Sequence, residues 1–267
     1  MSYKVYLWDS WSAIEWSQVT WRMEGTSVSW EACEGEMIHD VMLRHLPQDG
    51  LIVDAGCGTA KWPIYLRRRG YRCVGLEISS DACRIARGLD TGLPVACTDT
   101  RRAPLRGGAA DAVFSLGVVE HDEAGPLEGL RELRRILKTG GLLVLAVPFD
   151  NLFRRLVVNH LRRYVDWKRR RANARLVFAE YRFTRRELHR YLRATGFEPL
   201  HDYPNDLLPP KIMGLWVDWD GLRKPSLIEP LTDLFVLRGL KGRIARLAVR
   251  RTPWLVCGEV VVVARAR

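Results

Sequence analysis

The sequence lacks the features that would mark a membrane-spanning or secreted protein. No uninterrupted apolar stretch approaches the ~20 residues needed to cross a bilayer. Near the N-terminus, Trp8-Asp9-Ser10 interrupts the apolar residues, so no signal segment is visible. The chain also has no internal repeat and no low-complexity tract. We therefore expect a soluble, cytoplasmic protein, for which contact with a membrane surface stays open.

Cysteine is scarce and shows no metal-binding spacing. The six cysteines form no Cys-x-x-Cys pair, which argues against a zinc site or a dithiol redox motif. Four of them lie in or beside predicted core strands or the glycine-rich turn described below. We interpret them as buried free thiols in a reducing cytosol.

The net charge of +11 is unevenly distributed along the 267 residues. Residues 1–50 hold three basic and eight acidic residues, a net charge of −5, whereas residues 151–190 hold thirteen basic and three acidic residues, a net charge of +10. Such a local excess indicates an anionic partner nearby. Three interpretations stay open for the two basic amphipathic segments at residues 151–171 and 231–251. The pair is either a solvated face, a clamp for a phosphorylated, carboxylated or carrier-bound acceptor, or an interfacial element on an anionic membrane.

A glycine-rich turn is the most informative feature of the chain. Residues 51–53 have the character of a buried strand, and Asp54 precedes Gly56 and Gly58. These glycines allow the backbone to turn sharply and to approach a ligand closely, with the N-terminus of the following helix aimed at that ligand. Nineteen residues past Gly58, a second strand-like run ends in Glu77. A carboxylate at this position can accept from both hydroxyls of a ribose.

The spacing of the turn distinguishes between nucleotide cofactors. A nicotinamide-binding turn would have the pattern Gly-x-Gly-x-x-Gly, but Lys61 occupies the place of the third glycine. The pattern here is Asp-x-Gly-x-Gly, with Ala60 where another glycine often lies. The turn therefore favours a nucleoside-containing cofactor other than a nicotinamide dinucleotide.

Strand-like and helix-like segments alternate from residue 51 onward, which predicts an α/β fold with a largely parallel sheet and helices on both faces. We expect strands at residues 51–55, 72–77, 94–97, 111–116, 142–148, 197–203 and 256–265. We expect helices at residues 31–46, 61–69, 80–89, 124–137, 151–171 and 184–195. The helix after Thr184 has a capping-box sequence, because Glu187 lies at its third position.

Four motifs occur in the order and spacing of a known family. They are the Asp-x-Gly-x-Gly turn, the Leu-Glu-His-like segment 115–121, the segment 131–141 that matches "RxLKPGG" with Thr139 in place of the proline, and the segment 183–197. Together they resemble the class I S-adenosylmethionine-dependent methyltransferases, in particular the ubiquinone-biosynthesis-like type 11 branch. The resemblance covers about residues 45–200 and 256–265. It implies a Rossmann-like sheet of seven strands, mostly parallel, with the last strand inserted antiparallel beside the fifth, plus a helical cap.

The resemblance also implies S-adenosylmethionine as the cofactor and a role for each residue around it. The implied binding residues are Asp54, Ala55, Gly56, Cys57, Gly58, Glu77, Ile78, Asp99, Thr100, Leu116 and Gly117. Asp54 would support the turn and the ammonium group, and Glu77 would accept from the ribose hydroxyls. Ile78 would cover one face of the adenine, and Asp99 would accept from its amino group. Residues 116–117 would line the methionine side.

Methyl transfer requires the acceptor atom to be held about 3 Å from the methyl group, and a base is needed only when the acceptor must lose a proton. The candidate base is His121, whose near-neutral pKa suits proton removal. An equal alternative is a structural histidine bonded to the loop. Glu120 would orient the histidine or bind a cation. Some relatives bind a divalent metal through Glu-x-x-Glu-His, but Gly117 replaces the first glutamate, so we expect no metal.

The predicted organisation combines a cofactor-binding core with segments that build a cap. The core comprises residues 48–150, a helix and strand at 183–204, and a final strand at 255–267. The cap comprises a helical, Trp-rich segment at 1–47, a basic helical insertion at 151–182 and a helical insertion at 205–254.

Three functions remain possible for this organisation. The sequence favours O- or C-methylation of a small-molecule acceptor that is anionic, carrier-bound or lipid-like. A nucleic-acid methyltransferase is suggested by the arginines, but the fourth strand lacks the Asn/Asp-Pro-Pro-Tyr motif and no separate RNA-binding module is visible, so a nucleic-acid partner is not expected. The third possible function is that of a protein that binds the cofactor but transfers no methyl group, or that performs other chemistry in the same pocket. The oligomeric state stays open.

Overall fold

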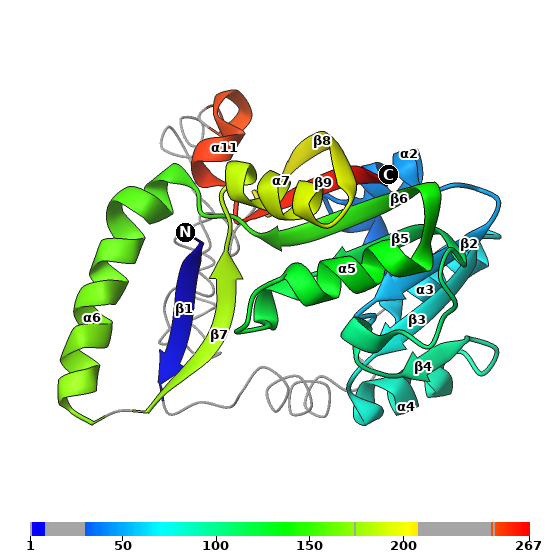
Figure 1. Ribbon diagram of the computed structural model, residues 1–267, viewed down its shortest axis with the longest axis horizontal. Coiled ribbons are helices and arrows are strands. Elements are labelled where there is room, and N and C mark those ends of the chain that lie inside the picture. The colour runs from blue at the N-terminus through cyan, green and yellow to red at the C-terminus, as the bar shows by residue number, and fades with distance from the viewer. Residues whose placement is uncertain (1, 9–29, 174, 208–246, 248) are drawn as a thin grey trace.

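The computed structural model describes residues 2–8, 30–173, 175–207, 247 and 249–267 (Figure 1). The strands in this part of the chain form one seven-stranded sheet and one two-stranded sheet. Residues 9–29 of the Trp-rich segment predicted at 1–47 to belong to the cap lie outside the described residues. The same holds for most of the insertion predicted at 205–254. No helix within the described ranges combines the length and apolar character that crossing a membrane would require.

The seven-stranded sheet has the order β4-β3-β2-β5-β6-β9-β8. Its strands are β2 (Leu51–Ala55), β3 (Arg72–Glu77), β4 (Val95–Cys97), β5 (Ala110–Leu116), β6 (Leu137–Pro148), β8 (Phe197–Asn205) and β9 (Glu259–Ala266). Strands β2 to β6 are parallel, and β9 lies antiparallel between β6 and β8. This confirms the predicted Rossmann-like fold, including the antiparallel last strand beside the fifth strand of the sheet in chain order.

Helices cover both faces of this sheet, because its central strands present apolar side chains in both directions. The helices are α2 (His39–His45), α3 (Lys61–Arg68), α4 (Ser80–Leu89), α5 (Leu127–Ile136) and α7 (Arg185–Ala194). Leu130 of α5 and Leu188 of α7 belong to the core on one face, whereas Met42 of α2 and Leu66 of α3 belong to the core on the other. The capping box of α7 is confirmed, with Thr184 and the glutamate three residues later bonded in both directions.

Two local predictions differ from the structure. The single helix expected at 31–46 is divided into a 3₁₀ helix, η2 (Trp30–Gly35), and the short α2. Strand β6 begins at Leu137 and extends through the Gly-Gly pair, whereas the prediction placed its start at residue 142. In both cases the element type is right and the boundary is not.

The two-stranded sheet was not predicted. It pairs β1 (Tyr3–Trp8) with β7 (Leu176–Arg182) in antiparallel register. Within the segment 151–182, expected to be helical, helix occupies a π-helical turn, η5 (Arg154–Val158), and α6 (Asn159–Arg171). The prediction is wrong for β7, because its inward positions are Phe178, Glu180 and Arg182. Two of these three buried side chains are charged, so the period-two pattern of a strand is hidden.

Candidate active site

The glycine turn after β2 forms as the sequence predicts. Gly56 and Gly58 have φ angles of +94° and +55°, which L-residues rarely adopt. The backbone N–H groups of Gly56 and Cys57 both donate to the carbonyl oxygen of Leu76, at 2.8 and 2.9 Å. A Cβ atom on Gly56 would lie 2.2 Å from Cγ2 of Val118. The turn is therefore in close contact with the loop that follows β5, and no side chain fits at Gly56 without displacement.

Glu77 is buried at the end of β3 and fixes this turn. Its Oε2 atom accepts from the N–H of Gly58 and its Oε1 atom accepts from the N–H of Ser79, both at 2.8 Å. Each carboxylate oxygen can accept more than one hydrogen bond. The predicted role in binding ribose hydroxyls is thus compatible with these bonds, which set the orientation of the carboxylate.

Asp54 is buried beneath the turn. Burial raises its pKa well above the usual value, and the nearby charge of Glu77 raises it further, while Lys61 opposes both effects. The ammonium group of Lys61 is paired with Glu36, which also accepts from the indole N–H of Trp62 at 3.1 Å. A second cationic group beside Asp54 would favour its ionised form.

Asp99 follows β4 and has a partner that the sequence analysis did not foresee. The guanidinium group of Arg101 donates to the carboxylate of Asp99 through Nε at 3.1 Å and Nη2 at 2.7 Å. These hydrogen bonds hold the pKa of Asp99 below its usual value, against the effect of partial burial. The Nη1 atom of Arg101 donates to Asp122 at 3.1 Å. Arg101 therefore connects the predicted adenine side, where Ile78 is 38% exposed, to the loop after β5.

Strand β5 ends at Leu116. The loop after it brings Glu120 to the edge of the sheet at which the parallel strands end, called the cofactor edge below. Ser115 donates through Oγ to the carbonyl oxygen of Ala55 at 3.0 Å, which links β5 to the end of β2. Gly117 has a φ angle of +71°, and a Cβ atom there would lie 3.6 Å from Oε1 of Glu120. The short helix η4 (Val119–His121) then places Glu120 and His121 side by side.

Glu120 and His121 form a pair that is anchored on the two-stranded sheet. The Nδ1 atom of His121 lies 2.6 Å from the carbonyl oxygen of Ala179 in β7. Since a carbonyl oxygen only accepts, Nδ1 carries the proton and Nε2 is the basic nitrogen. Nε2 lies 3.9 Å from Oε1 of Glu120. Glu120 is 2% exposed, and its Oε2 atom has no hydrogen-bond partner among the described residues.

The electrostatics of this pair suit proton transfer near neutral pH. Burial raises the pKa of Glu120 to about 7, with a smaller contribution from Glu180, although His121 opposes the shift. Burial lowers the pKa of His121, but the charges of Glu120 and Glu180 and the bond to the Ala179 carbonyl outweigh it, so the net pKa is raised. The two groups titrate together, and the pair can bind or release a proton close to pH 7.

The parallel order of β4, β3, β2 and β5 brings the predicted site residues to one edge of the sheet, because the carboxyl ends of these strands meet there. The residues at this edge are Asp54 to Gly58, Glu77 and Ile78, Asp99 and Thr100, and Leu116 to His121. Their individual roles stay predictions. Within the described ranges, no three His, Cys, Asp or Glu side chains gather as metal ligands would, and metal independence also stays a prediction.

The sequence analysis missed Ala179, Glu180 and Arg101 as members of this site. Ala179 contributes a backbone carbonyl, which carries no sequence signal. Glu180 is buried and accepts from Nε of Arg182 at 3.2 Å. The alternation of Phe178, Glu180 and Arg182 would have identified a strand only if buried charges had been allowed in the pattern.

Comparison with known proteins finds methyltransferases. Residues 53–145 match a family model described as a methyltransferase domain. The chain is 32% identical over 107 residues to the tRNA (carboxymethyluridine(34)-5-O)-methyltransferase of Arabidopsis thaliana, covering 39% of this chain and 26% of that protein. It is 32% identical over 119 residues to the demethylmenaquinone methyltransferase of Mycolicibacterium vanbaalenii, covering 42% of this chain and 49% of that one. The chain thus spans less than half the length of the curated relatives it matches.

The fold is similar to that of solved methyltransferase structures. The geranyl diphosphate C-methyltransferase from Streptomyces coelicolor A3(2), in complex with Mg²⁺, geranyl diphosphate and S-adenosyl-L-homocysteine, matches with a TM-score of 0.54 and 18% sequence identity. The match covers 89% of this chain and 79% of that one. At this identity the similarity concerns the fold.

Proposed function

We propose that this chain is a class I S-adenosylmethionine-dependent methyltransferase, supported by the methyltransferase-domain match at residues 53–145, and that it transfers a methyl group from S-adenosylmethionine to an oxygen or carbon atom of a small-molecule acceptor. The observation that carries this proposal is the Glu120–His121 pair. It combines a buried carboxylate oxygen that has no hydrogen-bond partner in the described part of the chain with a basic imidazole nitrogen, and it lies next to Gly117 at the cofactor edge. Such a pair is useful where an acceptor hydroxyl or carbon acid must lose a proton.

The residues at this edge fit the cofactor. S-adenosylmethionine, when bound, supplies a methyl group that is already activated by its positive sulfur. The positive φ angle of Gly56 turns the backbone sharply after β2, so the backbone of the turn can approach the amino-acid portion. The carboxylate of Asp54 would offset the ammonium charge, and Glu77 would accept from the ribose hydroxyls. Ile78 and Asp99 would contact the adenine.

His121 is the proposed base. Its Nδ1–H is fixed on the Ala179 carbonyl, so Nε2 is free to accept the proton of the acceptor. The imidazolium that results is stabilised by the carboxylate of Glu120. Glu120 therefore acts through His121, by setting its orientation and raising its pKa. Glu120 is buried, whereas the side chain of His121 is 40% exposed and can be reached by an acceptor.

The first experiment is calorimetric titration of the whole protein with S-adenosylhomocysteine. We expect binding by the wild type and at least tenfold weaker binding by Glu77→Ala, because two backbone bonds of the turn and the proposed ribose contact are lost together. The matched control is Glu128→Ala on α5, whose side chain is exposed. Absence of binding by the wild type, or equal affinities for the wild type and Glu77→Ala, would contradict the proposal.

The second candidate is methylation of a nucleic acid. It is favoured by the similarity to the tRNA methyltransferase and by the basic segment 151–190. It ranks second because the chain is equally similar, at 32% identity, to the demethylmenaquinone methyltransferase, so this similarity does not select a nucleic-acid acceptor. Transfer of labelled methyl groups to bulk tRNA, and not to a panel of phenols and carbon acids, would reverse this order. Cofactor binding without transfer to either class would indicate the third alternative, a binding protein.

The remaining parts of the proposal concern the organisation of the chain. We propose that residues 48–150, 183–204 and 255–267 form the cofactor-binding core and that the other segments build the acceptor side. The cytoplasm is the proposed compartment, and fractionation of cells that produce the protein tests it.

A further inference from the structure

Exposed apolar side chains gather on one segment of the structure. Six of the eleven exposed large apolar residues among those described lie between residues 152 and 167. They are Leu152, Leu156, Val157, Leu161, Tyr164 and Trp167, with exposed fractions of 46, 65, 41, 48, 59 and 49%. Such clustering differs from the scattered apolar residues that are normal on a protein surface and indicates a contact site.

Leu152 lies in the helical turn just before η5, Leu156 and Val157 lie in η5, and the other three lie in α6. Figure 1 shows α6 (green) at the outer side of the two-stranded sheet, beyond β1 and away from the seven-stranded sheet. Its inner side is held by polar contacts. Arg162 donates to the carbonyl oxygen of Tyr6 at 2.8 Å, and Asn159 donates to Asp150 at 2.9 Å. The helix is thus anchored through buried polar groups, while its apolar groups face outward.

Cations accompany the exposed apolar residues. The exposed basic residues of the same segment are Arg155, Arg163, Lys168, Arg169, Arg170 and Arg171, and the one acidic residue between 152 and 171 is Asp166. The rings of Tyr164 and Trp167 stack with their centroids 6.0 Å apart, and the guanidinium of Arg171 lies 4.3 Å from the Trp167 ring centroid. Tyrosine and tryptophan beside lysine and arginine are typical of membrane interfaces.

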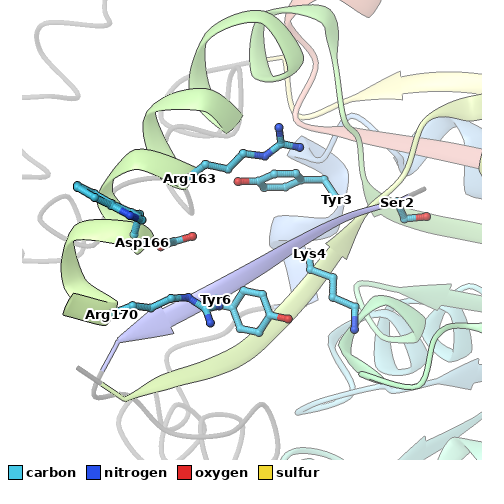
Figure 2. A pocket seen from close by; sticks show the side chains of 8 residues that line it. Ser2, Tyr3, Lys4, Tyr6, Arg163, Asp166 and Arg170 are labelled. Carbon is cyan, nitrogen blue, oxygen red and sulfur yellow. The ribbon is translucent and has the colours of Figure 1, made fainter. Parts of the chain in front are cut away.

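The basic surface continues into a shallow hollow of about 470 Å³ between α6 and β1 (Figure 2). Arg163 and Arg170 of α6 and Lys4 of β1 contribute cations to it. The guanidinium of Arg163 lies 5.7 Å from the Tyr3 ring centroid, and that of Arg170 lies 5.8 Å from the Tyr6 ring centroid. Asp166 also lines the hollow, so an anionic group that enters it would meet three cations and one carboxylate beside aromatic rings.

We propose that the surface formed by residues 152–171, the α6 face, docks onto an anionic lipid bilayer. The leucines, Val157 and Trp167 enter the boundary between headgroups and acyl chains, and the exposed arginines and Lys168 contact the phosphates. Charge complementarity selects an anionic partner. The four exposed aliphatic residues then favour lipid over nucleic acid, because single-stranded nucleic acids are bound mainly through cations and stacked aromatic rings.

The test is sedimentation of the full-length protein with vesicles. One set contains phosphatidylcholine alone, and the other contains equal parts of phosphatidylcholine and phosphatidylglycerol. We expect the wild type to bind the second set at least about tenfold more strongly, because each exposed cation near the surface adds to the attraction. Leu156→Ser/Trp167→Ser and Lys168→Glu/Arg171→Glu should each reduce this binding about tenfold or more.

Matched variants control for general loss of apolar or basic surface. Leu89→Ser/Leu255→Ser removes two side chains of 37 and 39% exposure elsewhere, and Arg186→Glu/Arg190→Glu reverses two exposed charges on α7. Both should bind vesicles as the wild type does. Thermal unfolding and affinity for S-adenosylhomocysteine confirm that each variant is folded, and they also separate failure of this proposal from failure of the proposed function.

Three outcomes would overturn the proposal. The first is no difference between the two vesicle sets for the wild type. The second is equal binding by the α6 variants and their controls. The third is retardation of tRNA in a gel that is lost in Lys168→Glu/Arg171→Glu, together with vesicle binding that is unchanged in Leu156→Ser/Trp167→Ser. That last result would identify the α6 face as a nucleic-acid surface.

Discussion

Replacement of Gly56 by alanine tests the geometry on which the active site depends. Two independent costs arise in this variant. An L-residue at φ of +94° is strained by about 1–3 kcal/mol. The new Cβ atom, 2.2 Å from Val118 Cγ2, forces the loop after β5 to move at a further cost of about 1–3 kcal/mol. We expect the free energy of unfolding to fall by about 2–6 kcal/mol in total.

Gly70 offers a matched control. Its φ angle is +88°, close to that of Gly56, but a Cβ atom there has no neighbour within 4 Å. Gly70→Ala therefore carries the backbone cost without the contact, and it should be less destabilising than Gly56→Ala by about 1–3 kcal/mol. Urea unfolding with linear extrapolation measures both values.

Val118→Ala completes the comparison. In that background the two closest atoms, Cγ1 and Cγ2 of Val118, are removed and only Cβ remains at 3.3 Å, so adding Gly56→Ala should cost little more than Gly70→Ala does in the wild type. Gly56→Ala alone should also weaken the binding of S-adenosylhomocysteine, whereas Gly70→Ala should not. Equal losses of stability for Gly56→Ala and Gly70→Ala would refute the close approach of the two loops and, with it, the position assigned to Glu120.

Four further predictions concern the Glu120–His121 pair and the cap of helix α7. Glu120→Gln should lower the pKa of His121 toward its ordinary value, because the main charge that raises this pKa is lost. NMR titration of the imidazole measures the change, and the signal of His121 is identified by its absence in His121→Asn. Turnover of the wild type should rise with pH through the raised pKa of His121, since only the deprotonated Nε2 accepts a proton. His121→Asn should lose about 10²–10⁴-fold of that turnover, and an unchanged rate would assign the histidine a structural role. Thr184→Ala should lower the free energy of unfolding by about 1 kcal/mol, because α7 loses its capping box; urea unfolding measures this loss, and an unchanged midpoint would contradict it.

The part of the fold that sequence could predict is the part whose signals are local. Strands β2, β3 and β5 are buried on both faces and end at turns, so each is recognisable as a short apolar run. The glycines of the turn require positive φ angles, and the capping box needs only two residues three positions apart. Each of these features depends on neighbours in the chain, and each was predicted at its correct place.

The two-stranded sheet and the contacts of His121 and Asp99 could not be predicted, because their signals are non-local. The register of the two-stranded sheet pairs Tyr3 with Arg182, and neither strand buries enough apolar side chains to be recognised alone. The bond that fixes His121 ends on a backbone carbonyl of β7, which any residue type could supply. Asp99 was assigned to adenine, but its guanidinium partner Arg101 is shared with Asp122, a contact that depends on how two loops pack.

The order of the elements along the chain connects the two proposals. Helix α6 ends at Arg171 and β7 begins at Leu176, so the surface proposed to meet a bilayer is followed directly by the strand that holds His121. If both proposals hold, an acceptor dissolved in the bilayer gains from docking, whereas a water-soluble acceptor does not. Leu156→Ser/Trp167→Ser should then slow methylation of an acceptor presented in anionic vesicles and leave the rate with the same acceptor in detergent unchanged. Equal slowing in both media would mean that these side chains act on the site itself rather than through the membrane.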